Sequence, residues 1–192
     1  MPPSDARKAA PVAAPVRYSA AARWLHWVVA AFVVCLIPLG IYMVARGEAT
    51  NFDAVTGTLY SLHKLFGFIV LWFILLRVLV RLQRAAPPPV ATLTPLERVA
   101  SHVVHGALYI MLVTVPLLGW AGISAYPALD VFGLFNLPAI LSPDQELANR
   151  ILGNHKLAAL LLGGLALVHI AAALRHRFLK RDGVFQRMWP PN

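Results

Sequence analysis

Histidine is the residue type that offers chemistry in this sequence. Seven histidines occur among 192 residues, and most of them fall inside, or at the edge of, long apolar segments. Imidazole nitrogens bind transition metals and exchange protons near neutral pH, whereas an ionisable side chain is costly inside a membrane. The spacing of the histidines therefore indicates which chemistry is open to the chain.

The last apolar segment carries two histidines, His155 and His169. Their spacing is close to four turns of a helix, so both side chains share one face and lie about 21 Å apart along the axis. A compact zinc or copper site needs ligands that converge on one point, which these two cannot do. One ligand near each membrane surface suits two cofactors stacked in a helical bundle.

Depth along the helices selects partners for these two histidines. His26 lies as deep as His169 on one side, and His63 lies as deep as His155 on the other. Two bis-histidine sites result, and an imidazole pair is typical of six-coordinate heme iron that transfers electrons. The sequence has no CxxCH motif, so the heme is expected to be non-covalent, and the single cysteine, Cys35, excludes a disulfide within the chain.

Four apolar segments must position these histidines. Each is long enough to cross about 30 Å of hydrocarbon as a helix. The chain is 59% hydrophobic and 13% charged, which is typical of a membrane protein rather than of a soluble domain. We therefore predict an all-α integral membrane four-helix bundle over residues 23–188, with helices over about 24–44, 59–82, 99–123 and 151–174.

The segments outside these helices have distinct compositions. Residues 1–22 are rich in alanine and proline and lack the compact apolar core of a targeting signal, which predicts a flexible cytoplasmic tail. Residues 124–150 contain three prolines and predict an outer-side loop along the membrane surface, with room for one short helix. Pro38 and Pro116 fall inside helical segments, where neighbouring helices support a kink rather than a helix end.

The distribution of the net charge of +9 gives the orientation. The N-terminal tail, second loop and C-terminal tail carry 13 basic and three acidic residues, and the first and third loops carry four basic and five acidic residues. The two sides are therefore +10 and −1, and the positive-inside rule places both termini in the cytoplasm. Because the basic residues flank apolar runs, they indicate membrane topology and no nucleic-acid partner.

Some residues allow two readings. Arg77 follows His63 by about four helical turns, and it could pair with a propionate of the cytoplasmic heme or anchor the helix at the interface. His102 and His176, at the interface, could be functional or merely solvated. Five glycines could let flat macrocycles approach the backbone or could serve ordinary helix packing: Gly40, Gly67, Gly119, Gly163 and Gly164.

Several short motifs follow one another along the chain. They are Arg23-Trp24-Leu25-His26-Trp27, Leu62-His63-Lys64, Arg77 to Leu82 before the prolines, His102-Val103-Val104-His105, Asn154-His155-Lys156, Leu167-Val168-His169, and Arg175-His176-Arg177-Phe178 followed by Arg181-Asp182-Gly183. No single motif is unique, but the ordered set, from about Arg17 to Met188, resembles the bacterial cytochrome b561 family. That family includes di-heme, quinone-linked proteins described as superoxide oxidases.

The resemblance implies a function for further residues. It implies two hemes b, on the pairs His26/His169 and His63/His155, in the bacterial inner membrane, with ubiquinone near one heme. A positively charged outer pocket for superoxide is expected in this family, and the residues that could attract the anion are Lys64, Arg150 and Lys156. The residues at the cytoplasmic end, where a quinone headgroup could collect protons, are His102, His105, Arg175 and His176, and the histidines among them are suited to deliver those protons.

Three functions remain open at this point. The first is a free-standing enzyme that passes electrons from superoxide to ubiquinone. The alternative is a membrane-anchor cytochrome b subunit that relays electrons between quinone and a partner dehydrogenase or hydrogenase. The third is a transporter or structural membrane protein whose histidines relay protons. The sequence contains no soluble domain or long docking tail, which favours the free-standing enzyme.

Overall fold

The computed structural model describes residues 17–84 and 86–189. Four long α-helices account for most of this range, and each is long and apolar enough to cross a membrane, so the predicted four-helix membrane bundle is confirmed. Most of the predicted tail, residues 1–16, lies outside the described residues. The helices are α1 (Ala20–Thr50), α2 (Ala54–Gln83), α3 (Pro95–Ala125) and α4 (Gln145–Arg175).

Polar caps explain why the helices extend beyond the apolar segments. The side chains of Ser19, Asp53 and Asp144 accept hydrogen bonds from backbone N–H groups in the first turns of α1, α2 and α4. Thr94 and Glu97 form a reciprocal capping box at the start of α3. Each cap satisfies N–H groups that a helix leaves free at its N-terminus, so the helices begin in polar sequence and carry their ends out of the hydrocarbon.

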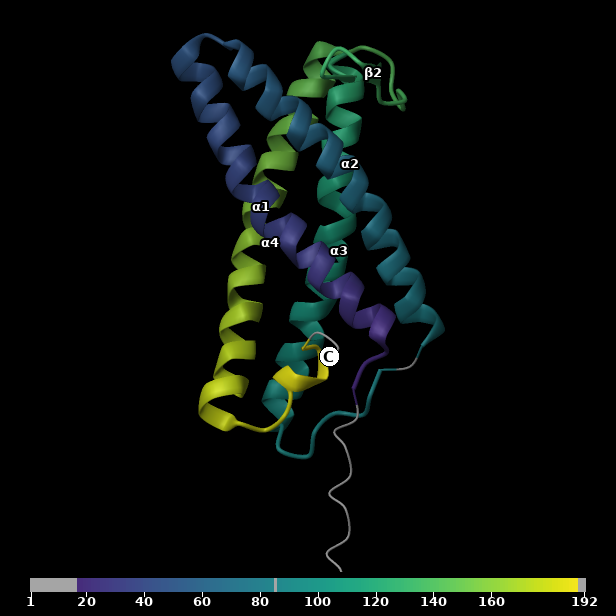
Figure 1. The fold of residues 1–192 in the computed structure, drawn as a ribbon, viewed down its shortest axis with the longest axis vertical. Coiled ribbons are helices and arrows are strands. Elements are labelled where there is room, and N and C mark those ends of the chain that lie inside the picture. The colour runs from purple at the N-terminus through teal and green to yellow at the C-terminus, as the bar shows by residue number, and fades with distance from the viewer. Residues whose placement is uncertain (1–16, 85, 190–192) are drawn as a thin grey trace, which may run out of the picture.

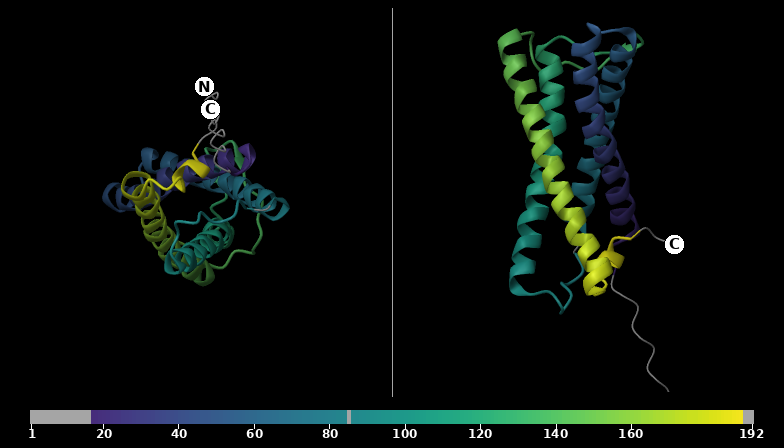
Figure 2. Two further views of the ribbon diagram at one scale, coloured as in Figure 1. Left: turned by 90° about the horizontal axis from the view of Figure 1, so that it is seen from below. Right: turned by 90° about the vertical axis from the view of Figure 1, so that its left-hand side faces the viewer.

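The helices run side by side along the long axis of the molecule (Figure 1). α1 packs mainly against α2, and α3 packs mainly against α4, with further contacts between α2 and α3. The α1–α2 turn and the loop between α3 and α4 lie together at one end, here called the hairpin end (Figure 2). The described N- and C-terminal residues lie at the opposite end, here called the terminal end.

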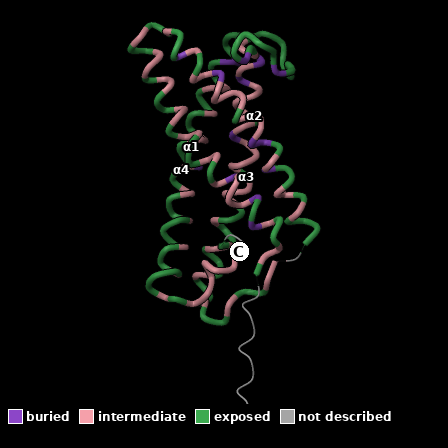
Figure 3. The backbone as a smooth tube through the Cα atoms, in the orientation of Figure 1, coloured by how far each residue is buried: buried purple, intermediate pink, exposed green. Residues whose placement is uncertain are grey.

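Few residues are buried, as expected for helices that face lipid (Figure 3). The core cluster at mid-height consists of Val29 from α1 with Val70 and Ile74 from α2. Large apolar side chains such as Ile110 and Leu161 point outward instead. α1 and α3 continue through Pro38 and Pro116, so neither proline ends a helix.

The loop at the hairpin end contains a short β-hairpin. The sequence prediction for residues 124–150 was a loop that could hold one short helix. Strand β1 (Asp130–Val131) pairs antiparallel with β2 (Phe135–Asn136). Lys64 of α2 donates to the backbone oxygens of Ala128 and Asp130. Val131 is fully buried, so the hairpin is seated on the bundle.

The C-terminal segment folds back across the start of α1. A π-helical turn, η1 (His176–Lys180), extends α4, and a 3-10 turn, η2 (Phe185–Arg187), follows after Gly183, which has a φ of +82°. The backbone N–H of Tyr18 donates to the Arg187 oxygen at 3.3 Å, and the indole N–H of Trp27 donates to the Met188 oxygen at 2.7 Å. These bonds fasten the end of the chain to its first helix.

Candidate cofactor sites

The terminal end brings together one histidine from α1 and one from α4. The ring centres of His26 and His169 are 6.1 Å apart, and their planes are inclined at 77°. Both rings are half-buried between the helices. His26 and His169 are also the two residues that matching depth in the sequence predicts as a pair.

The hairpin end holds a second pair with the same separation. The ring centres of His63 on α2 and His155 on α4 are also 6.1 Å apart, with planes inclined at 88°. The two pairs therefore use opposite ends of α4, and each takes its second ring from the α1–α2 hairpin.

The spacing within each pair fits a metal ion held between two imidazoles. With a metal–nitrogen bond of about 2.0 Å and a ring centre about 1.1 Å behind the nitrogen, two rings on opposite sides of one ion have centres about 6 Å apart. Within residues 17–84 and 86–189, no group of three or more His, Cys, Asp or Glu side chains could hold a metal. Paired axial ligands of a heme therefore fit this arrangement, and a compact protein-only metal cluster does not.

Hydrogen bonds and close packing orient the rings at the hairpin end. The Nδ1 of His155 donates to the Val115 oxygen on α3 at 2.9 Å, which leaves Nε2 as the ligating nitrogen, a usual arrangement in metal-binding histidines. A Cβ atom added at Gly119 would lie 3.1 Å from the His155 ring, and one at Gly40 would lie 3.1 Å from the His63 ring. These two glycines therefore make room for the histidines.

The other three glycines singled out in the sequence do not touch a histidine. Nothing lies within 4 Å of a Cβ added at Gly67 or Gly164, and one at Gly163 would meet Ile37 at 3.6 Å. Gly163 is thus an ordinary packing position, and no neighbour in the described structure constrains the other two.

Of the two histidines that open α3, one lies beside the terminal-end pair. The ring centre of His105 is 5.1 Å from that of His169, and its Nδ1 donates to the Ser101 oxygen at 2.6 Å. This separation is shorter than two rings across a metal ion require, so His26 fits better as the partner of His169. His102 is exposed, and its Nδ1 donates to the Arg98 oxygen at 2.7 Å.

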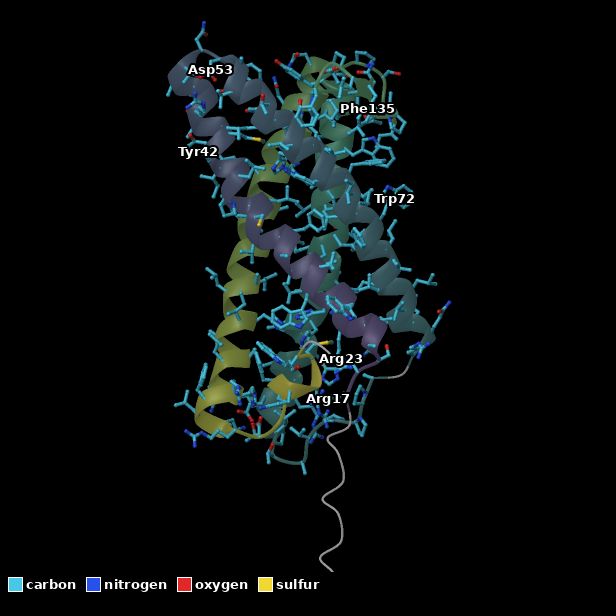
Figure 4. All side chains as sticks on the ribbon, in the orientation of Figure 1. Arg17, Arg23, Tyr42, Asp53, Trp72 and Phe135 are labelled. Atoms are coloured by element: carbon cyan, nitrogen blue, oxygen red, sulfur yellow. The ribbon has the colours of Figure 1, made fainter. Side chains whose placement is uncertain are left out.

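Two arginines also occupy the terminal end. Arg77 reaches from α2 to donate to the Ala22 oxygen at 3.1 Å, and its guanidinium lies 5.7 Å from the centre of the Tyr109 ring. Arg23 is only 9% exposed, and its Nε and Nη1 are buried without a hydrogen-bond partner among the described residues. Figure 4 labels Arg23 at this end of the bundle. In the sequence Arg23 stood among the topology charges and opened the Arg23–Trp27 motif, with no ligand assigned to it; its place one turn before His26 was the available signal.

The remaining cytoplasmic candidates are engaged in ion pairs. Nδ1 of His176 donates to Asp182 at 2.7 Å, and Arg175 and Lys180 both bind Glu97. Burial alone would raise the pKa of the Asp182 carboxyl, but hydrogen bonds from His176 and the Val184 backbone N–H outweigh burial and leave that pKa below its ordinary value. These pairs tie the ends of α3, α4 and the C-terminal segment together.

The three cations proposed to attract superoxide lie at the hairpin end in different situations. Lys64 is half-buried and bound to backbone oxygens of the β-hairpin. Arg150 is exposed and pairs with Glu146 one turn earlier. Lys156 is exposed, follows His155 directly, and has no salt bridge within the described ranges. Lys156 is thus the least engaged of the three.

Comparison with known proteins identifies the family. Residues 17–191 match the family described as prokaryotic cytochrome b561. The chain belongs to this family. The family resemblance seen in the motifs is therefore confirmed, and with it a multi-pass bacterial membrane protein of electron transfer, from a family that binds b-type heme.

Several curated relatives of this cytochrome b561 chain align over nearly its whole length. Cytochrome b561 homolog 2 of Escherichia coli is 29% identical over 175 residues, which cover 91% of this chain and 92% of the relative. The probable superoxide oxidase CybB of Yersinia pestis is 25% identical over 175 residues, covering 91% and 96%. Cytochrome b562 of Cereibacter sphaeroides is 29% identical over 171 residues, covering 87% and 91%.

Proposed function

We propose that this cytochrome b561 carries two hemes b and passes electrons from superoxide, at the outer face of the bacterial inner membrane, to ubiquinone. The observation that carries the proposal is the pair of histidine couples, each with ring centres 6.1 Å apart, at opposite ends of one bundle. On this proposal His26 and His169 hold one heme, and His63 and His155 hold the other. Bis-histidine heme supplies one-electron transfer with no open position for a substrate.

The protein's part is to hold the two sites at opposite depths. His155 and His169 lie on one continuous helix. Their positions differ by about 21 Å along its axis, which is most of the roughly 30 Å of hydrocarbon. The surrounding apolar helices exclude water from the path between the sites. Electrons that enter at one face can then leave at the other.

A hollow at the terminal end supports quinone binding there. It has a volume of about 430 Å³ and is lined by Leu174, Arg177, Phe178, Phe185, Gln186 and Trp189. The buried Oε1 of Gln186 has no hydrogen-bond partner in the described structure. An apolar hollow with a few polar groups is typical of a small-molecule site, and we assign the quinone headgroup to it.

Aromatic contacts join this hollow to the nearer histidine pair. The Trp189 ring centre is 5.6 Å from that of Trp27, which is in turn 5.4 Å from that of His26. A single intervening indole, that of Trp27, therefore connects His26 to a residue that lines the hollow. Quinone takes up two electrons and two protons to become quinol. His176, which precedes the lining residue Arg177, and His105, beside His169, are the groups suited to supply protons.

At the opposite face we assign the attraction of superoxide chiefly to Lys156. This cation is exposed beside His155, whereas Lys64 and Arg150 already have partners. The first and third loops together are net −1, so the attraction has to be local, acting within about a Debye length of 8–10 Å. Two superoxide anions give two electrons and two molecules of oxygen, which balances the reduction of one quinone.

A spectrum of the purified protein tests the proposal. A reduced-minus-oxidised spectrum with two low-spin b hemes per chain is expected, with rapid reduction by superoxide and turnover on adding ubiquinone. A colourless protein, or one heme per chain, contradicts the di-heme assignment. A di-heme protein that superoxide does not reduce, and that co-purifies with a dehydrogenase or hydrogenase, supports the membrane-anchor alternative instead.

A further inference from the structure

We infer that Arg23 binds a heme propionate at the terminal end, with Arg77 as the second cation of the same site. This inference rests on the proposed function, because it requires a heme between His26 and His169. It concerns a residue that the sequence placed in a motif and among the topology charges but to which it assigned no ligand.

The first observation is the state of the Arg23 side chain. It is 9% exposed, and its buried Nε and Nη1 have no hydrogen-bond partner among the described residues. Arginine remains charged in proteins and offers five N–H donors. A buried charge without a partner is strongly unfavourable, so an anion is expected to meet this guanidinium.

The second observation is that the described carboxylates at this end already have partners. Glu97 binds Arg175 and Lys180, and Asp182 binds His176. The other described acids, Glu48, Asp53, Asp130, Asp144 and Glu146, belong to the hairpin end. Asp5 and any carboxylate carried by the segment from residue 190 onward lie outside the described residues, and they are the protein alternatives that an experiment has to address. A carboxylate supplied by a cofactor meets the need directly.

The third observation is the location of the two arginines relative to the histidine pair. Arg23 precedes His26 by one helical turn, so the two side chains are neighbours on α1. Arg77 enters the same layer from α2, because it donates to the oxygen of Ala22, the residue next to Arg23. Neither arginine forms a salt bridge in the described structure. Two guanidinium groups that have no carboxylate partner among the described residues match the two propionates that heme b carries.

The C-terminal segment explains why this site is dry. Its backbone oxygens accept from the Tyr18 N–H just before α1 and from the Trp27 indole N–H on α1, on either side of Arg23. Water therefore has little access to the guanidinium, and a charge-assisted hydrogen bond is stronger in such surroundings than at the surface.

Two arginine variants of the full-length, heme-loaded protein test the inference. Arg23→Gln removes the charge, and Arg98→Gln, at an exposed position of the same end, removes a charge that faces solvent. A cation beside a heme favours the reduced state, so R23Q should make the terminal-end heme at least tenfold harder to reduce, which for one electron is about 59 mV. The hairpin-end heme should be unchanged in R23Q, and both hemes should be unchanged in R98Q.

Infrared redox-difference spectra report the contact itself. With heme labelled by ¹³C in its propionates, R23Q should shift the labelled carboxylate bands and R98Q should not. Where R23Q does not accumulate, Arg23→Lys keeps the charge but loses the two-pronged hydrogen bond, and it should shift the bands in the same way with a smaller change in potential.

Several results would overturn the inference. Unchanged potentials and unchanged propionate bands in R23Q, in a protein that still holds two hemes, refute it and leave the proposed function intact. A shift of equal size in Asp5→Asn identifies Asp5 as the partner of Arg23 and also refutes it. An R23Q spectrum in which only unlabelled carboxylate bands respond identifies a carboxylate of the protein as the partner and refutes it in the same way. A wild-type protein without heme refutes the proposed function itself.

Discussion

Replacing Gly119 by alanine should loosen the heme of the hairpin end selectively. The new Cβ would lie 3.1 Å from Cε1 and 3.2 Å from Nδ1 of His155, whereas ordinary contacts begin at 3.4 Å, so the ring has to withdraw by a few tenths of an ångström. The ring cannot withdraw freely, because its Nδ1 is held at 2.9 Å by the Val115 oxygen of the same helix, α3. Overpacking of this kind costs about 1–3 kcal/mol, which corresponds to a roughly 5- to 150-fold loss of heme affinity.

The assay is the transfer of heme from the purified protein to apomyoglobin, with heme counted per chain. In a His26→Ala background only the hairpin-end heme is expected to remain, so the transfer rate reports that site alone. Gly106→Ala is the matched control, because it lies in α3 and nothing approaches its added Cβ within 4 Å. Alanine is also the better helix former by about 1 kcal/mol, so the control should be neutral or slightly stabilising.

The comparison between the two alanine variants decides the outcome. If Gly119→Ala retains the hairpin-end heme as tightly as Gly106→Ala does, the close approach of Gly119 to His155 has no bearing on cofactor binding. If Gly119→Ala in the otherwise wild-type chain releases the terminal-end heme instead, the assignment of His155 to the hairpin-end site is wrong.

Three further perturbations have expected outcomes. His26→Ala or His169→Ala should each remove one heme and the same spectral component, and two variants that remove different components would break the pairing. Lys156→Glu should slow heme reduction by superoxide at low ionic strength, measured by stopped flow. The difference in rate from wild type should shrink as salt is added, because salt screens the charge. A difference in rate that does not change with salt would argue against attraction of superoxide by Lys156. At the α1–α2 turn, hydrogen bonds from the Thr56 N–H and hydroxyl and from Arg46 hold the pKa of Asp53 at about 2, below its ordinary value. Because the pKa of Asp53 is lower in the folded than in the unfolded state, the ionised carboxylate contributes its full stabilisation above about pH 4 and loses it as pH falls towards 2. Thermal melts of Asp53→Asn should therefore lack this part of the acid-induced fall in melting temperature. Equal acid sensitivity of the wild-type protein and Asp53→Asn would contradict this role of Asp53.

The histidine pairs were accessible from the sequence because depth in a membrane follows directly from position along a helix. Two residues about four turns apart on one helix must lie near opposite surfaces, and antiparallel neighbours then supply partners at matching depth. Depth does not set the rotation of each helix about its own axis, and this rotation decides which glycines meet a histidine. Gly40 and Gly119 face histidine rings. A Cβ added at Gly67 or Gly164 would meet nothing within 4 Å.

Two other features depended on contacts that no local pattern carries. Lys64 follows His63 and was expected to attract an anion, but it donates to backbone oxygens of a β-hairpin that is distant in sequence. Arg23 belonged to the basic residues that set the topology, but it is buried, one turn before Trp27, where the C-terminal segment returns onto α1. Basic residues at a membrane surface have the same sequence signature whether they face solvent or are buried by a distant segment.

The bundle consists of two closely packed helix pairs, α1 with α2 and α3 with α4, and this pairing has a consequence for assembly. Each histidine pair joins a ring from the α1–α2 pair to a ring on α4. On the proposed assignment the two hemes therefore cross-link the α1–α2 pair to the α3–α4 pair, and these two pairs pack less extensively against each other than the helices do within each pair. Neither heme can bind both of its histidines until α4, the last of the four described spans to leave the ribosome, has entered the bilayer. A cell short of heme would then hold chains whose halves drift apart laterally and are open to membrane proteases, and the abundance of this cytochrome would follow the heme supply.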